Sequence, residues 1–438
     1  MNRRDLLAGG AAAIGDLALP YRAFASVPSL EDAAREAWLY TVPLVEVANV
    51  RRRILANGPA NTFRHNRNLT NIETQRVTSP NNDTMYSHGV LDLRAGNVEV
   101  TLPPAGDRYL SVQIVDMYSN TVAVLGTRAT GSNGGRFIVA GPTGAAPVEA
   151  IRTPQPWAFI LARTLVDGPE DVPAARAIQD GLKIDGAAGQ VPQIEVPSRD
   201  ADWRTWFDGL GKLLVDSPPP STDHALLDRI APLGLTRTGF HLRSFDADAI
   251  RRIEAGMASA RAVVADTQLG KQVVDGWAYP PYDLGDFGQN YLFRAQIAVS
   301  GLFALPLEEA LYTRSTGDAA DGLFHGNGYY LHFDGENMPP VDAFWSVTLY
   351  EARPDGQFFF TRNPIDRYAV GDRTPGLVRH ADGSLDLWIS RTDPGPARRN
   401  NWLPAPKDKP FMLSMRAYLP QAALLNGAYH FPAVRPTT

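Results

Sequence analysis

The sequence predicts a mainly β protein with a helical insert. Two stretches, about residues 90–163 and 329–418, contain short apolar or alternating segments between turns, which is typical of antiparallel strands. Between them, apolar residues recur at helical spacing. Glycine and proline, at 38 and 35 residues, are frequent enough for many turns, and 438 residues exceed what one small core needs. We therefore expect two β-rich regions joined by helices.

Composition excludes several classes of partner and site. The formal net charge is −5 and no block of like charges occurs, so a nucleic-acid partner is not expected. Cysteine is absent, which excludes disulfides, thiolate metal ligands and a cysteine nucleophile. Stability must come from packing.

The N-terminal sequence predicts that the protein is exported. Arg3 and Arg4 precede a short apolar segment, and Ala23-Phe24-Ala25 has the form of a cleavage site. This pattern indicates a twin-arginine signal peptide over residues 1–25 and a periplasmic or secreted protein, although Asp16 interrupts the apolar segment. An ordinary N-terminal helix is the alternative. No later apolar run is long enough to span a bilayer, so stable membrane insertion is not expected.

Residues 26–168 are predicted to form an N-terminal helix followed by a β-sandwich. Ser29 has the spacing of a capping box, and Pro43 is expected to kink or end the helix, with a second piece over Leu44–Leu55. The strands expected after residue 90 are Val98–Leu102, Tyr109–Asp116, Arg136–Val139 and Trp157–Arg163.

A helical middle region is predicted for residues 169–300 and a second β region for residues 301–438. The expected helices include Val172–Leu182, Trp203–Val215, Ala225–Leu233 and Ala247–Ala265. In the C-terminal region, many short strands and three Asp-Gly turns favour a jelly roll or a related sandwich.

The polar stretch 79–93 is the first candidate site. Asn82, Asp83 and Tyr86 lie in a turn that leads directly into a strand, and strand-braced turns often display binding groups. Asn and Asp also hydrogen-bond their own backbone, so a purely structural turn is the alternative. His65 precedes this stretch and is a candidate general base, or else a loop histidine with a structural role.

Two further pairs are candidates for substrate binding. Asp116 and Tyr118 follow a strand expected in the same sheet, so we expect them to converge on Asp83. Tyr291 and Arg294 lie on one side of a predicted helix, where the guanidinium suits an anionic ligand group. An internal salt bridge of Arg294 is the alternative.

The chain also resembles two bacterial families. The run Pro80–Ser87 together with Gly126–Gly131 resembles the domain of unknown function numbered 1254, and Ala343–Tyr350, Asn363–Tyr368 and Asn401–Pro406 look like its C-terminal companion, numbered 1214. The resemblance implies an immunoglobulin-like sandwich, a helical middle and a C-terminal jelly-roll domain. It implies no catalytic residues.

Two functions remain open. The eight histidines lack metal-ligand spacing, and no phosphate loop, dinucleotide fingerprint or serine-hydrolase elbow occurs, so neither a metal nor a cofactor is predicted. One hypothesis is an enzyme in which Asp83, Tyr86 and His65 perform acid–base chemistry in an interdomain cleft, with Arg294 or Arg367 orienting the substrate.

The other hypothesis is a non-catalytic binding or structural module. In it, four aromatic residues are partly core and partly a stacking surface for a carbohydrate or aromatic ligand: Trp345, Trp388, Trp402 and Tyr368. Both hypotheses expect a small-molecule or oligosaccharide ligand, and both permit a homo-oligomer. Fold class does not decide between them.

Overall fold

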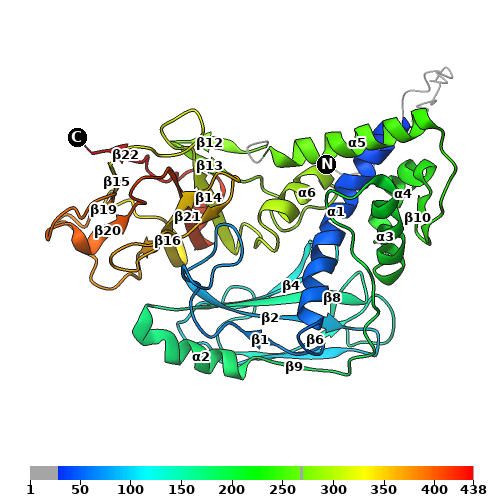
Figure 1. The fold of residues 1–438 in the computed structure, drawn as a ribbon. Coiled ribbons are helices and arrows are strands. Elements are labelled where there is room, and N and C mark those ends of the chain that lie inside the picture. The colour runs from blue at the N-terminus through cyan, green and yellow to red at the C-terminus, as the bar shows by residue number, and fades with distance from the viewer. Residues whose placement is uncertain (1–27, 267–269, 438) are drawn as a thin grey trace, which may run out of the picture.

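The computed structural model describes residues 28–266 and 270–437. In these residues the strands form five sheets, and most helices gather in one group (Figure 1). The prediction of a mainly β protein with a helical part is confirmed at this level. The predicted signal peptide, residues 1–25, lies outside the described residues.

The N-terminal β region is a pair of facing sheets. Buried side chains such as Leu91, Val100, Val112 and Ile160 fill the space between them. The first sheet has the order β1 (Arg64–His65), β2 (Thr84–Asp92), β8 (Trp157–Leu165), β4 (Leu110–Val115) and β5 (Thr121–Gly126). The second has the order β7 (Ile151–Arg152), β6 (Gly135–Ala140), β3 (Val98–Leu102) and β9 (Lys183–Asp185).

The C-terminal β region also packs two sheets around one core, which includes Leu331, Val347, Leu387 and Met415. The larger sheet runs β12 (Gln272–Val274), β13 (Trp277–Tyr279), β14 (Ala310–Ser315), β21 (Phe411–Pro420), β16 (Val341–Ala352) and β17 (Phe358–Phe359), and β18 (Ala369–Gly371) pairs with β16. The smaller runs β20 (Trp402–Pro404), β19 (Leu385–Ser390), β15 (Gly328–Phe333) and β22 (Arg435–Pro436). Strands β12 and β13 come from residues predicted as part of the helical middle region.

Most of the helices match the predicted segments closely. They are α1 (Leu30–Leu55), α2 (Val172–Gly181), α3 (Trp203–Asp216), α4 (His224–Ile230), α5 (Ala247–Ala265), α6 (Tyr291–Ser300) and α7 (Ala422–Leu425), with a small hairpin of β10 (Leu235–Thr236) and β11 (Gly239–Phe240) beside α3. Ser29 caps α1, since its hydroxyl accepts from the Asp32 N–H at 3.1 Å. The prediction of a separate helical piece over Leu44–Leu55 is wrong, because α1 continues through Pro43 as a single helix of 26 residues.

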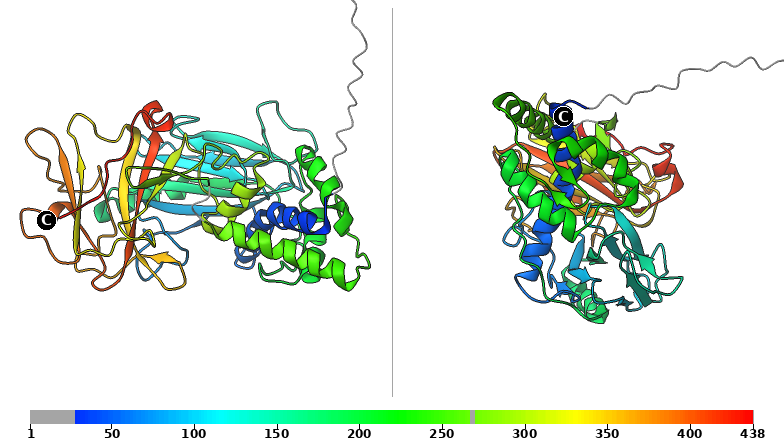
Figure 2. Two further views of the ribbon diagram at one scale, coloured as in Figure 1. Left: turned by 90° about the horizontal axis from the view of Figure 1, so that it is seen from above. Right: turned by 90° about the vertical axis from the view of Figure 1, so that its right-hand side faces the viewer.

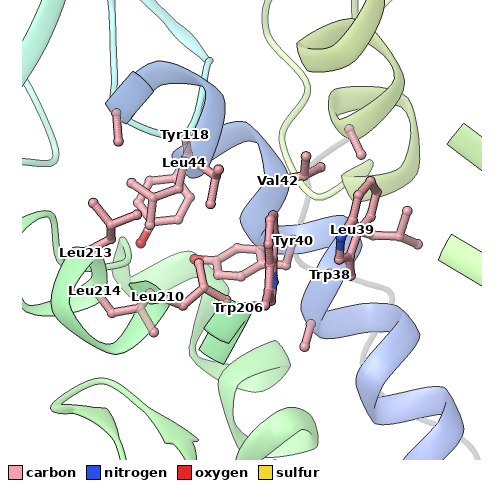
Figure 3. Packing of buried hydrophobic residues seen from close by; sticks show 14 of the residues in the cluster. Trp38, Leu39, Tyr40, Val42, Leu44, Tyr118, Trp206, Leu210, Leu213 and Leu214 are labelled. Atoms are coloured by element: carbon pink, nitrogen blue, oxygen red, sulfur yellow. The ribbon is translucent and has the colours of Figure 1, made fainter. Parts of the chain in front are cut away.

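Burial explains why α1 tolerates its proline. A helix-interior proline removes one backbone hydrogen bond, at a cost of about 3 kcal/mol. The residues around Pro43 are buried on all sides, so packing offsets this cost. Trp38 and Trp206 stack with ring centroids 5.8 Å apart. Figure 3 shows α1 side chains packed against those of α3, which makes α1 the centre of the helical group.

The helical group and the C-terminal β region both pack on the outer face of the five-stranded sheet. At one end, Val90 and Phe159 pack into the helical core. At the other end, Tyr109 and Leu165 pack against Phe344 and other residues of the C-terminal β region. The helical group and the C-terminal region therefore lie side by side on this sheet, as the ribbon views show (Figures 1 and 2).

The crossing of α1 and α5 depends on Gly256. A Cβ atom at this position would lie 2.1 Å from the Glu31 carbonyl oxygen of α1. We expect Gly256→Ala to lower the free energy of unfolding by about 1–3 kcal/mol, the usual cost of overpacking, although alanine favours helices. Gly301→Ala is the control, because a Cβ there meets nothing within 4 Å. Urea denaturation of both variants measures the difference, and equal stability would show that the helices do not approach this closely.

Candidate functional site

The polar turn before β2 is anchored on the C-terminal β region. Asn81 Oδ1 accepts from the backbone N–H groups of Asp83 and Thr84, at 2.6 and 3.1 Å, so the turn has the expected Asx geometry. The Asn81 amide also donates to Tyr418 Oη at 2.7 Å, and the Tyr350 hydroxyl donates to the Pro80 carbonyl at 2.6 Å. The turn is therefore structural, and it fixes where Asp83 lies.

Two cross-strand rows contribute the polar groups of this interface. In the N-terminal sheet, Tyr86 lies directly opposite Arg163 on β8, and alternation places both on the outer face. In the C-terminal sheet, Arg416 of β21 lies between Ser346 of β16 and Tyr312 of β14. The side chains of Ser346, Arg416 and Tyr312 point away from their own core because their neighbours Val347 and Met415 fill it.

Asp83 joins the two rows. Its Oδ2 accepts from the Ser346 hydroxyl at 2.8 Å, which is a contact between residues 263 positions apart. Burial raises the pKa of the Asp83 carboxyl above its ordinary value, while the Arg416 guanidinium and the Ser346 hydrogen bond oppose that rise. Asp83, Tyr86 and Tyr312 are partly exposed when each residue is taken as a whole.

Two buried guanidinium groups are held rigidly at this interface, and that of Arg416 acts on the Asp83 carboxyl. Arg416 donates to Thr348 Oγ1 at 2.5 Å and to Tyr350 Oη at 2.6 Å, and Arg163 donates to Gln113 Oε1 at 2.9 Å and to the Phe303 carbonyl at 2.7 Å. Both side chains are 5% exposed. A charge fixed by neutral partners keeps its field available for a nearby anion.

A second carboxylate closes the interface on one side. Glu309 accepts from the Tyr109 hydroxyl at 2.9 Å and from Arg128 Nε at 2.6 Å. Burial raises the pKa of Glu309, and the hydrogen bond from Arg128 opposes the rise. Because both of its oxygens are occupied, Glu309 stabilises the contact between the two regions.

The arrangement can perform proton transfer. A carboxyl group with a raised pKa exchanges protons more readily near neutral pH than an ordinary aspartate does. Tyr86 and Tyr312 add hydroxyl groups to the same interface, and burial raises the pKa of Tyr312 to about 12, so this hydroxyl stays protonated as a donor. Arg163 and Arg416 supply positive charge for a developing oxyanion.

Two residues predicted near Asp83 have other roles. His65 Nδ1 lies 2.8 Å from Ser87 Oγ, and because Ser87 and Tyr86 are adjacent in β2, His65 is on the opposite face of the sheet from Tyr86. Burial lowers the pKa of His65. The Asn82 amide donates to the Thr70 carbonyl at 2.6 Å and holds a loop.

The expected convergence of Asp116 and Tyr118 on Asp83 is wrong. Strands β2 and β4 both pair antiparallel with β8 and therefore run parallel to each other. Asp83 precedes β2 whereas Asp116 follows β4, so they lie at opposite ends of the sheet. The Asp116 carboxylate accepts from the backbone N–H groups of Tyr118 and Asn120, both at 2.8 Å, and shapes the β4–β5 turn.

Tyr118 instead meets the predicted pair Tyr291 and Arg294 in the helical group. The Arg294 guanidinium lies over the rings of Tyr40, Tyr118 and Tyr291 at 5.3, 5.8 and 5.0 Å. Its Nε and Nη2 atoms have no hydrogen-bond partner in the described part of the chain. Tyr291 also donates to Asp223 at 3.0 Å and lines an open pocket of about 430 Å³.

Three candidates from the C-terminal region are structural. Trp345 and Trp402 are each 2% exposed, and the Trp402 indole donates to the Ser390 carbonyl at 3.1 Å. Arg367 donates to the carbonyl groups of Asn400 and Trp402 at 2.8 and 2.9 Å. It therefore braces the segment before β20.

Sequence reasoning missed Arg163, Tyr312 and Arg416. A signal for the arginines was present, because each follows or interrupts a run of apolar strand residues, Trp157–Ala162 for one and Phe411–Ala417 for the other. A charged group in such a strand needs a polar environment on at least one face. Tyr312 carried no comparable signal, since tyrosine is ordinary in strands.

Within residues 28–266 and 270–437, no group of three or more histidine and carboxylate side chains is placed to hold a metal ion. No helix in the same two ranges combines the length and the apolar character that crossing a bilayer requires.

Comparisons with known proteins identify the two regions. Residues 60–186 match the family described as protein of unknown function (DUF1254), and residues 309–422 match that described as protein of unknown function (DUF1214). No curated protein matches the chain. The crystal structure of the VPA0106 protein from Vibrio parahaemolyticus is similar over 94% of this chain and 100% of that one, with a TM-score of 0.71 and 23% identity, which shows a shared fold.

A putative uncharacterized protein from Burkholderia cenocepacia is 16% identical, with a TM-score of 0.47 over 92% of this chain and 88% of that one. Its likeness is too distant to add to the argument. The two family matches follow the order expected from the sequence and include both sides of the Asp83 interface, since Asp83 lies in the first and Ser346 and Arg416 in the second. The chain thus belongs to the proteins that join an N-terminal DUF1254 region to a C-terminal DUF1214 region.

Proposed function

We propose that this protein is an exported, periplasmic enzyme that performs acid–base chemistry on a small polar or carbohydrate-like molecule at the interface of its two β regions. Asp83 exchanges the proton, Tyr86 and Tyr312 hydrogen-bond the substrate, and the fixed charges of Arg163 and Arg416 stabilise negative charge that develops on it. These side chains supply the chemistry themselves. Export rests on the sequence of residues 1–25.

One observation carries the proposal. Asp83 is held by a hydrogen bond from Ser346 of the other β region, its pKa is raised by burial, and it lies within electrostatic reach of Arg416. A carboxyl group needed only for the turn could remain in water, since Asn81 already forms the Asx hydrogen bonds. Perturbed ionisable groups that converge from distant segments are typical of functional sites.

We also propose the finer fold assignment: an immunoglobulin-like N-terminal sandwich and a jelly-roll-like C-terminal one. Facing sheets with one core in each region support it. The non-catalytic alternative relied on Trp345, Trp388, Trp402 and Tyr368 as stacking surfaces. Trp345, Trp402 and Tyr368 are buried in the C-terminal region and offer no ring face to a ligand, whereas Trp388 is only partly buried.

The raised pKa of Asp83 predicts a pH-dependent stability. From the ordinary value of 3.8 up to its raised value, the folded protein holds more protons at Asp83 than the unfolded chain, so this residue makes stability fall as pH rises through that window. Asp83→Asn keeps an acceptor for Ser346 and removes the ionisation. We expect its melting temperature to equal or exceed that of the wild type at pH 7, with the difference shrinking towards pH 3.5. A lower melting temperature at pH 7 would mean that ionised Asp83 stabilises the fold.

Because Asp83→Asn is expected to fold, it can test catalysis. The purified protein is screened by thermal shift against sugars, sugar lactones and aromatic acids, since a ligand that binds the native state raises its melting temperature. NMR then follows the conversion of each compound that binds. We expect Asp83→Asn to bind the substrate but to turn it over about 10²–10⁴-fold more slowly, the usual contribution of an acid–base group. Tyr86→Phe should retain binding with a smaller loss of rate.

Asp92→Asn is the matched control, because Asp92 lies at the other end of β2 and pairs with Arg94 at 2.8 Å. Measured below its melting temperature, this variant should turn over the substrate at the wild-type rate. Equal rate losses in Asp83→Asn and Asp92→Asn would show that general damage to the sheet explains the effect, and unchanged turnover in Asp83→Asn would exclude it as the proton carrier.

A further inference from the structure

A second polar pocket lies on the C-terminal β region, on the outward face of its four-stranded sheet. It has a volume of about 420 Å³, and its walls come from β15, β22, β19 and the loops around residues 334–337 and 429–433. Along β15, the side chains of Tyr330 and His332 point outward, whereas those of Leu331 and Phe333 enter the core. No residue of the Asp83 interface lines this pocket.

A histidine–aspartate pair forms one wall. His332 and Asp386 are directly opposite each other on β15 and β19, and His332 Nδ1 lies 2.7 Å from Asp386 Oδ1. The other carboxylate oxygen lies 3.0 Å from His380 Nε2. An ionised carboxylate only accepts hydrogen bonds, so His332 carries its proton on Nδ1 and leaves the Nε2 lone pair available when neutral. The Asp386 side chain is 18% exposed whereas His332 is 51% exposed, so Asp386 orients His332 from beneath.

The remaining walls offer both donors and acceptors. Arg435 is next to Tyr330 in the sheet and donates only, Asp334 accepts only, and Asn337 does both. The carboxylates of Asp334 and Asp386 offset the charge of Arg435, so the charges of the pocket do not favour an anion. A neutral hydroxyl group both donates and accepts, so it suits this mixture. Tyr330 adds a ring that is tilted against Trp388 at 5.8 Å, and such rings pack against the apolar face of a sugar.

We propose that this pocket binds a neutral, polyhydroxylated, sugar-like molecule, and that His332 accepts a hydrogen bond from one of its hydroxyl groups through Nε2. Asp386 is the positioning residue, because it fixes the ring orientation and the tautomer of His332. Tyr330 provides the stacking surface. This site is separate from the Asp83 interface, and it stands or falls independently of the proposed enzymatic activity.

Saturation-transfer NMR with glucose, galactose and N-acetylglucosamine tests the site, combined with protein labelled with ¹³C at histidine Cε1. We expect at least one of the sugars to receive saturation and to shift the His332 signal. His332→Ala should weaken that sugar about tenfold, which corresponds to one good hydrogen bond. Asp386→Asn should weaken it less and should change the tautomer signature of His332, an effect that a merely structural role would not produce.

The chain contains a matched control. His325 and Asp321 form another exposed pair, with His325 Nε2 2.9 Å from Asp321 Oδ2, but His325 does not line the pocket. His325→Ala should bind the sugar as the wild type does. Three results would overturn the proposal: no saturation transfer to any of the three sugars, equal binding by His332→Ala and wild type, or a His332 shift with inorganic phosphate and none with a sugar.

Discussion

The burial of Arg416 between the two β regions is the constraint on which this architecture depends. Its guanidinium bonds to Thr348 and Tyr350 within its own sheet and reaches the Ser79 carbonyl of the N-terminal region at 3.3 Å. A buried charge with unmet donors is costly, so the two regions can dock only where the polar turn supplies the missing acceptor. Arg416 therefore determines the position of the turn, and with it the position of Asp83.

The apolar and the polar contacts of the interface have different roles. Phe344 and Tyr418 stack with their ring centroids 4.2 Å apart, and Tyr109 meets both rings edge to face. Apolar contact contributes affinity between the two regions but little orientation, because the hydrophobic effect has no direction. The hydrogen bonds of Asn81 and Ser346 provide the orientation. Stability and geometry of the site thus come from neighbouring but different side chains.

Sequence patterns predicted the elements better than their arrangement. Helical spacing located α3 and α5 to within one residue, and the alternation of apolar residues located β3 and β8 closely, because these patterns record which face of an element is buried. The prediction failed at Pro43, where tertiary packing outweighed a local helix breaker. It failed again for Asp116, because sharing a sheet with Asp83 does not reveal whether two strand ends lie at the same edge.

The candidate site was likewise predicted only in part from the sequence. The polar turn was visible in the sequence because Asn and Asp are unusual next to a buried strand, and Asp83 and Tyr86 were found in this way. Their partners Ser346 and Tyr312 lie more than 200 residues away in the sequence. Neither residue type signals a site, so these two are identified only by the docking of the two sheets. Local pattern can therefore mark one half of a site formed between two regions. The other half is identified only by the structure, from the hydrogen-bond partners that a buried charge such as Arg416 requires.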